Sequence, residues 1–195
     1  MNTKARIMNV ARHSFSKHGY EGTTLAQIAK EVGIQKPSMY NHFKSKAELY
    51  LLLCERITNQ LVDTIATTAA QYETSESKTR LYHVLKNSCD FIMYEQEGAM
   101  YKRFMLFPPA DLKQDVHSIV LKGDEAIHRT LHELFQQGQK EKRFKLIPEQ
   151  MFRSAYFCLL DGLFTESFIY EDDDFQRRFK EAWTIFWYGI STDSL

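Results

Sequence analysis

The sequence predicts an all-α fold of three short amino-terminal helices, joined by a long helix to a larger helical body. Apolar residues recur at i, i+3, i+4 and i+7 through most of the 195 residues, which is the pattern of amphipathic helices. No segment sustains the period-two alternation that is typical of strands. Capping residues and glycines stand at the ends of several apolar stripes, where they favour helix starts and stops.

The first two predicted helices are short and well delimited. One apolar face before Gly19 is formed by Ile7, Val10, Ala11, Ser14 and Phe15. If Gly19 ends this helix in a left-handed conformation, Tyr20 is expected to pack back on Phe15. The next stripe is formed by Leu25, Ile28, Ala29 and Val32. Thr24 and Gln27 have capping-box spacing before this second helix, and Gly33 supplies its left-handed stop.

A third helical segment, roughly Lys36 to Lys44, follows after only Ile34 and Gln35, which is helix-turn-helix spacing. Met39 and Phe43 supply its buried side, and Pro37 falls in its first turn. The outer face carries side chains of the kind that reach base edges and phosphates. These polar residues are Gln35, Lys36, Ser38, Tyr40, Asn41 and His42.

The fourth helix is predicted to be long and to link the head to the body. Ser45 and Glu48 have capping-box spacing, so the helix begins at Lys46 with its amino end free to meet a phosphate. Apolar residues at helical intervals continue to about Gln71 without an intervening Pro or Gly. A rigid helix of this kind can transmit a rotation from body to head.

The first fifty residues resemble the tetracycline-repressor (TetR/AcrR) family of bacterial transcription regulators. The resemblance rests on Phe15, Gly19-Tyr20, Thr23-Thr24, Ile28-Ala29, Gly33, Pro37 and the run Tyr40-Asn41-His42-Phe43-Lys44-Ser45-Lys46. It implies phosphate contacts by Thr24, Tyr40, His42 and Lys46, and approach to the major groove by Gln35, Lys36, Ser38 and Asn41, with Pro37 also in the DNA-binding set. Ala26 stands where many members carry an arginine that contacts bases or the DNA backbone. The third helix is therefore expected to contribute more of the base recognition.

The distribution of charge agrees with a basic, DNA-binding amino-terminal head on a body that does not bind DNA. The whole chain is neutral, but residues 1–50 carry a net charge of +5 and the rest carries −5. Cys54, Cys89 and Cys158 are widely spaced in helical patterns, which favours reduced thiols over disulfides, with redox sensing as the alternative. Neither a signal-peptide pattern nor an apolar run of transmembrane length is found, so we expect a cytoplasmic protein.

The last two predicted helices, from about 149 to 170 and from 175 to 190, are unusually apolar. They suggest half of a four-helix homodimer interface, an arrangement that the family resemblance also implies. The candidate interface residues are Phe152, Tyr156, Leu159, Leu163, Phe179, Trp183, Phe186 and Trp187. Alternatively, these side chains form the core of a single chain.

Helices between about 79 and 139 carry candidates for a ligand pocket, drawn from the helices that the family places around its inducer. Met and aromatic side chains suit adaptable binding of apolar molecules, although such residues also fill cores. The candidates are Phe91, Tyr94, Tyr101, Phe104, Met105, Phe107, Ile127 and Leu131. The ligand itself is not identified by these residues.

Two further clusters have simple explanations. His117, His128 and His132 fall on about the same helical face, where solvent exposure or lining of a pocket is the ordinary explanation and a metal site the alternative. The acidic run Glu171 to Asp174 precedes a helix, where carboxylates complement the dipole better than they suit calcium. No phosphate loop, nucleophile elbow or paired zinc-spaced cysteines occur, so no catalytic residue, metal or cofactor is expected.

We therefore expect a DNA-binding domain over residues 1–47 and a ligand-binding and dimerisation domain over residues 48–195. The expected protein is a homodimeric repressor, released from double-stranded operator DNA by a small apolar effector. An activating or architectural DNA-binding protein that acts through a protein partner is one alternative. A helical enzyme or carrier with an incidental head is another.

Overall fold

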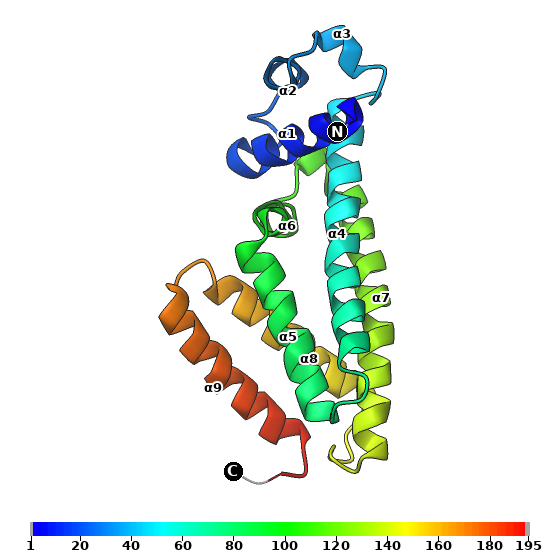
Figure 1. Ribbon diagram of the computed structural model, residues 1–195, viewed down its shortest axis with the longest axis vertical. Coiled ribbons are helices and arrows are strands. Elements are labelled where there is room, and N and C mark those ends of the chain that lie inside the picture. Colours follow the sequence, from blue (N-terminus) through cyan, green and yellow to red (C-terminus); the bar gives the residue numbers. More distant parts are fainter. Residues whose placement is uncertain (1, 194–195) are drawn as a thin grey trace. The chain divides into compact units, whose positions relative to one another are not determined.

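The computed structural model describes residues 2–193, and its regular structure there is helical, as the sequence predicts (Figure 1). The first helices are α1 (Thr3–His18), α2 (Leu25–Val32), α3 (Lys36–Met39) and α4 (Lys46–Gln71). They are followed by α5 (Ser77–Tyr94), α6 (Gln96–Leu106), the 3-10 helix η1 (Ala110–Leu112), α7 (Lys113–Lys140), α8 (Glu149–Glu166) and α9 (Asp172–Ile190). One isolated antiparallel bridge joins Phe144 to Ser191.

The chain forms two compact units, which divide it differently from the predicted domains. The first unit contains residues 1–60 and 94–123, and the second contains residues 61–93 and 124–195. The three helices of the head therefore share a packing unit with α6, η1 and the start of α7. The functional boundary after residue 47 stays a prediction. Residues 1, 194 and 195, at the ends of the two predicted domains, lie outside the described residues.

In the first unit, Phe15 of α1 is the centre of an aromatic cluster. Its ring is stacked on Tyr20 with centroids 6.1 Å apart and meets Tyr50 of α4 edge-on at 5.1 Å. Gly19 ends α1 with φ 75° and ψ 177°. The predicted contact of Tyr20 with Phe15 is thus confirmed. The left-handed helical conformation expected for Gly19 is wrong, because its extended ψ carries the chain away from α1.

Helix α6 lies beside α1 within the first unit (Figure 1), and side-chain bonds join the two helices. Arg12 of α1 forms an ion pair of 3.0 Å with Glu97 in the first turn of α6. At the other end of α6, Arg103 Nη1 donates to the carbonyl oxygen of Ser16 at 3.1 Å. These bonds join the two ends of α6 to the amino-terminal helix.

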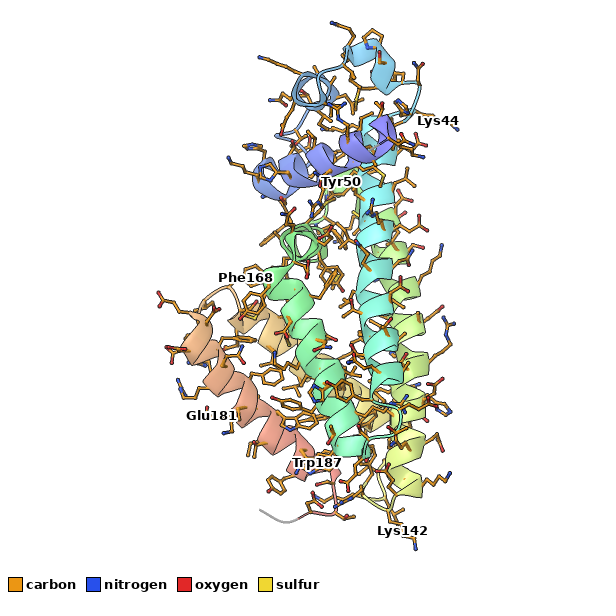
Figure 2. The ribbon with its side chains drawn as sticks, in the orientation of Figure 1. Lys44, Tyr50, Lys142, Phe168, Glu181 and Trp187 are labelled. Atoms are coloured by element: carbon orange, nitrogen blue, oxygen red, sulfur yellow. The ribbon has the colours of Figure 1, made fainter. Side chains whose placement is uncertain are left out.

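The second unit has an aromatic core to which α8 and α9 contribute (Figure 2). Phe152 and Tyr156 of α8 are fully buried, and Trp187 of α9 is 1% exposed. Tyr82 of α5 meets the Trp183 ring edge-on, with centroids 5.3 Å apart. Much of the apolar stripe on the last two helices is therefore packed within a single chain.

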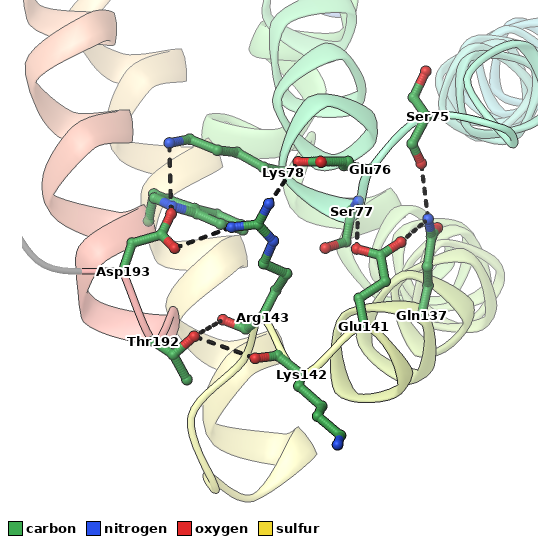
Figure 3. A network of polar contacts seen from close by, with 11 residues as sticks. Ser75, Glu76, Ser77, Lys78, Gln137, Glu141, Lys142, Arg143, Thr192 and Asp193 are labelled. Atoms are coloured by element: carbon green, nitrogen blue, oxygen red, sulfur yellow. Dashed lines mark hydrogen bonds and ion pairs between the residues drawn. The ribbon is translucent and has the colours of Figure 1, made fainter.

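A polar network ties the loops at one end of the second unit (Figure 3). Glu141 accepts a hydrogen bond of 2.9 Å from the backbone N–H of Ser77, at the start of α5. Arg143 pairs with Glu76 at 3.0 Å, and Asp193 accepts a hydrogen bond of 2.8 Å from the Trp187 indole N–H. The network links the α4–α5 loop, the α7–α8 loop and the segment after α9.

Several predicted helix ends differ from the observed ones. The helix expected over Lys36 to Lys44 ends at Met39, because the following residues turn more tightly than an α-helix. The backbone N–H of Tyr40 bonds to Pro37, and that of His42 bonds to Met39, both with i→i−3 spacing. Helix α8 ends at Glu166 rather than near residue 170, and α9 begins at Asp172 rather than Phe175. The acidic run consequently lies at the start of α9, where it complements the helix dipole.

Candidate nucleic-acid interface

The turn between α2 and α3 is built as the sequence predicts. The backbone N–H of Thr24 donates to Gln27 Oε1 at 2.8 Å, and the N–H of Gln27 donates to Thr24 Oγ1 at 3.3 Å. Gly33 has φ 79° and ψ 33°, and the N–H of Ile34 bonds to the Ala29 carbonyl at 2.9 Å. Both ends of α2 are thus capped, and α3 begins three residues after Gly33 in a defined direction.

Two apolar side chains, one in α3 and one just after it, anchor this segment, and its polar residues face solvent. Met39 is fully buried and Phe43 is 1% exposed. The predicted DNA-binding residues Thr24, Gln35, Lys36, Pro37, Tyr40 and Asn41 are exposed, while Ser38, His42 and Lys46 are partly exposed. Exposure makes these side chains available to a duplex. Their contacts with DNA stay a prediction.

Lys46 has a contact that sequence reasoning missed. Its Nζ donates to the carbonyl oxygen of Tyr20 at 2.8 Å and lies 4.0 Å from the centroid of the Tyr20 ring. The ammonium group therefore holds the α1–α2 loop against the start of α4. An ammonium group has three donors, so the contact with Tyr20 leaves Lys46 capacity for a phosphate.

Lys44 is a further candidate that the predicted set of DNA-binding residues left out. It is exposed in the loop between α3 and α4, and its side chain projects outward (Figure 2). The loop is fixed by the backbone N–H of Lys44, which donates to the Glu48 carboxylate, and by the Glu48 N–H, which donates to Ser45 Oγ at 3.0 Å. Basic charge in the head was the available sequence signal for Lys44.

The predicted pocket residues fall in both units, and their role in ligand binding stays a prediction. Phe104 and Met105 line a cleft of about 510 Å³ in the first unit. Tyr101 of the same unit is buried, whereas Tyr94 and Phe107 are 55% and 75% exposed. The other three candidates, which are buried in the second unit, are Phe91, Ile127 and Leu131.

The predicted interface residues divide into buried and accessible groups. Six are buried within one chain: Phe152, Tyr156, Leu163, Phe179, Trp183 and Trp187. Leu159 and Phe186 are partly exposed, and the more exposed apolar side chains on these helices are Met151 at 59% and Ile185 at 67%. Pairing with a second copy stays a prediction, and Ile185 and Met151 are accessible to it.

The three histidines fall in both units. His117 lines the cleft of the first unit, whereas in the second unit His132 Nδ1 lies 2.9 Å from the Glu149 carboxylate and His128 packs on Phe157. Within residues 2–193 no three His, Cys, Asp or Glu side chains are grouped as a metal would require. The acidic start of α9 is bonded locally, since Arg177 pairs with Asp174 at 3.0 Å.

The three cysteines are free thiols. Cys54 and Cys89 are buried, and burial raises the pKa of both, that of Cys89 to about 12. Thiols in this state are poor nucleophiles at neutral pH. Cys158 is the exposed member of the three. In the part of the chain that is described, none of the helices is apolar enough over a sufficient length to cross a membrane.

Residues 7–53 match the family described as bacterial regulatory proteins, tetR family. The transcriptional activator FasR of Mycolicibacterium smegmatis is 30% identical over 95 residues, which are 49% of this chain and 42% of FasR. The biofilm operon icaADBC negative transcriptional regulator IcaR of Staphylococcus epidermidis is 42% identical over 60 residues, which are 31% of this chain and 32% of IcaR. The chain thus spans less than half the length of these curated relatives.

The fold also has solved counterparts. The structure of SmeT, the repressor of the Stenotrophomonas maltophilia multidrug efflux pump SmeDEF, matches with a TM-score of 0.75 and 17% sequence identity. The match covers 100% of this chain and 93% of the SmeT chain. It establishes the all-α architecture of a helix-turn-helix head with a helical body.

Proposed function

We propose that this chain, which belongs to the tetR family of bacterial regulatory proteins through its amino-terminal domain, is a homodimeric DNA-binding transcriptional repressor. The observation that carries this proposal is the geometry of α3. Met39 of α3 and Phe43, four residues after it, are buried, and polar side chains of the lengths that contact DNA face solvent. We assign no catalytic residue, and we place the protein in the cytoplasm, where its DNA target is found.

The exposed residues of the head divide by chemistry into two groups. Tyr40, Lys44 and Lys46 carry the hydroxyl and ammonium donors that bind phosphate oxygens, whatever the sequence of the duplex. Ser38 and Asn41 are short polar side chains on and just after α3, suited to hydrogen bonds with base edges in the major groove. Affinity and base preference should therefore depend on different residues.

A homodimer would place two such heads about one helical turn of DNA apart, so that each reads one half of a palindrome. The exposed apolar side chains of α8 and α9, Met151 and Ile185 above all, support self-association through these helices. In this arrangement the buried aromatic residues hold α8 and α9 in place, and the exposed Met151 and Ile185 form the contact between the two copies.

Release by a small effector is supported by the contacts between α6 and α1. A ligand that displaces α6 would act on the head through Arg12–Glu97 and Arg103–Ser16, both within the first unit. Helix α4, which starts beside the DNA-reading segment, offers a second route for a rotation. Coupling of about 1–3 kcal/mol between effector and operator binding is enough to regulate transcription.

The alternative function is that of an activator. One observation favours it, because the relative FasR is a transcriptional activator whereas IcaR is a negative regulator. The direction of regulation depends on where the operator lies relative to a promoter, so the head can serve either function.

Selection of bound duplexes from a random DNA pool, using the purified full-length protein at moderate salt, tests the proposal. An inverted-repeat consensus is the expected result. Salt-sensitive binding without any consensus would indicate an architectural protein, and the absence of binding would contradict the assignment of a DNA-reading head.

A further inference from the structure

The cleft in the first unit has apolar walls and one polar side. It has a volume of about 510 Å³, within the usual range for small-molecule sites. Its apolar lining, which is mainly aliphatic, consists of Phe104, Met105, Pro108, Val116 and Val120. Phe104 is fully buried, so it forms a fixed wall, while Met105 is partly exposed and can adapt its shape.

The polar lining comes from the first turns of α7. Lys113, Gln114 and His117 line the cleft, and all three are exposed. Within residues 2–193, none of these three side chains takes part in a hydrogen bond or ion pair with another residue. Among the described residues, no Asp or Glu lines the cleft, so its fixed charge is positive and lies at one side of an apolar surface.

We propose that this cleft is the effector site and that it binds an aliphatic carboxylate, with the chain against Val116, Val120 and Met105 and the carboxylate beside Lys113. An ammonium group and a carboxylate form a charge-assisted hydrogen bond, which is stronger than a bond between neutral groups. A cationic ligand would meet Lys113 with no carboxylate in the lining to offset the repulsion. This proposal rests on the effector-controlled function proposed above and specifies the chemistry of the effector.

The same cleft is adjacent in sequence to a bond with the head. Arg103, the residue before Phe104, donates to the carbonyl oxygen of Ser16 at 3.1 Å and also reaches the Lys17 carbonyl at 3.5 Å. A ligand that moves Phe104 and Met105 therefore also moves the group that holds the end of α1. Binding in this cleft would therefore change the position of α1 without any contact between the ligand and DNA.

Calorimetric titration of the full-length protein with octanoate, 1-octanol and octylammonium tests the ligand class, because the three probes share an apolar chain and differ in charge. We expect octanoate to bind at least about tenfold more tightly than 1-octanol, with octylammonium weakest. Equal affinities for the three probes, or no binding of octanoate at millimolar concentration, would overturn the proposal.

Substitutions locate the site. Lys113→Met should lower octanoate affinity by about tenfold and leave 1-octanol affinity unchanged, and Lys113→Glu should reverse the preference towards octylammonium. Lys122→Met is the matched control, since Lys122 is also exposed on α7 but does not line the cleft. Val120→Trp should block all three probes by filling the cleft. Unchanged octanoate binding in both Lys113→Met and Val120→Trp would place the ligand elsewhere.

Operator binding by the ligand-free protein, measured by fluorescence anisotropy on the selected duplex, separates the two proposals. If the protein binds its operator but octanoate shows no charge preference, the ligand assignment fails and the regulator assignment stands. If the protein binds no operator while octanoate binds beside Lys113, the site is retained and the regulatory function is contradicted.

Discussion

The guanidinium of Arg103 lies against the backbone of Gly19, whose positive φ favours glycine at this position. A Cβ at this position would lie 2.7 Å from Arg103 Nη2, and the residue has φ 75°. The same guanidinium bonds to the Ser16 carbonyl, so the end of α1 is both turned and held by one contact with α6. This contact joins residues 87 positions apart in the sequence.

Gly19→Ala should destabilise the protein by about 1–3 kcal/mol, because an L-residue with φ near +75° and an extended ψ is strained. Urea unfolding measures the change. The double variant Gly19→Ala/Arg103→Ala should recover only the steric part of the loss, since the backbone strain remains. Full recovery in the double variant would show that backbone conformation is not the cause.

Lys44→Ala and Tyr40→Phe should weaken binding to every duplex, specific or random, because the proposed contacts are to phosphates. Lys44→Ala removes a charged contact, so it should also reduce the slope of log affinity against log salt by about one. Tyr40→Phe removes an uncharged hydroxyl group, so its slope should change less. Anisotropy titrations over a salt series test this, with Lys140→Ala on α7 as the control. A slope equal to that of the wild type in Lys44→Ala would remove Lys44 from the interface.

Arg80→Met should destabilise the second unit by about 1–3 kcal/mol. Arg80 is 8% exposed, its Nε donates to the Ala69 carbonyl at 2.7 Å, and its Nη1 donates to Gln137 Oε1 at 2.8 Å. Removing the guanidinium leaves buried acceptors near the end of α4 without this donor. Arg129→Met, at an exposed position on α7, is the matched control and should change the unfolding free energy little.

Acid should destabilise the network of Figure 3. Burial raises the pKa of Glu141, but hydrogen bonds from Ser77 and Gln137 and the charge of Arg143 outweigh it, so the net shift is downward. The Trp187 indole N–H, with Arg143 and Lys78, lowers the pKa of Asp193. A depressed folded-state pKa contributes stability above the unfolded value, and this stability is lost as pH falls through the folded value.

The loss should therefore begin as pH falls through the ordinary values of 4.5 for Glu141 and 3.8 for Asp193 and continue below them. Urea unfolding of Glu141→Gln and Asp193→Asn at several pH values checks this. Each variant should be less stable than the wild type at pH 7 and should lose less stability on acidification. A parallel loss in variants and wild type would assign the acid sensitivity to other carboxylates.

Ile185→Glu should convert the proposed dimer to a monomer while leaving the fold intact, because Ile185 is 67% exposed within one chain. Sedimentation equilibrium measures the association, and circular dichroism checks the helices. Leu121→Glu, at another exposed apolar position, on α7, serves as the control. A dimer that persists in Ile185→Glu would exclude this position from the interface.

Capping residues and glycines in the sequence predicted the start and end of α2 well, because the ends of this helix are determined by neighbouring residues. Thr24, Gln27 and Gly33 act within one turn of the helix that they cap, and they lie as expected. The end of α3 was missed because Tyr40 and His42 close i→i−3 bonds that helical periodicity does not distinguish from α-helix. The boundary of a four-residue helix depends on such differences.

Residues in the body were harder to assign, for a physical reason. An apolar stripe such as that of α9 has the same spacing whether it packs in the core of its own chain or against a second copy. The burial of Trp187 shows only that this side chain packs within its own chain. Bonds between distant segments, such as Arg103 to Ser16 or Lys46 to Tyr20, carry no periodic signal. The cleft beside Phe104 is formed by residues from 104 to 120, and helical periodicity alone does not predict that they enclose a space.

The most direct test of the DNA-reading role of α3 is duplex selection performed in parallel on the wild-type protein and on Asn41→Ala. The account predicts an inverted repeat for both proteins, with base preference relaxed in the variant at one pair of symmetry-related positions. An unchanged consensus at every position, together with unchanged affinity, would contradict the claim that this surface reads the operator.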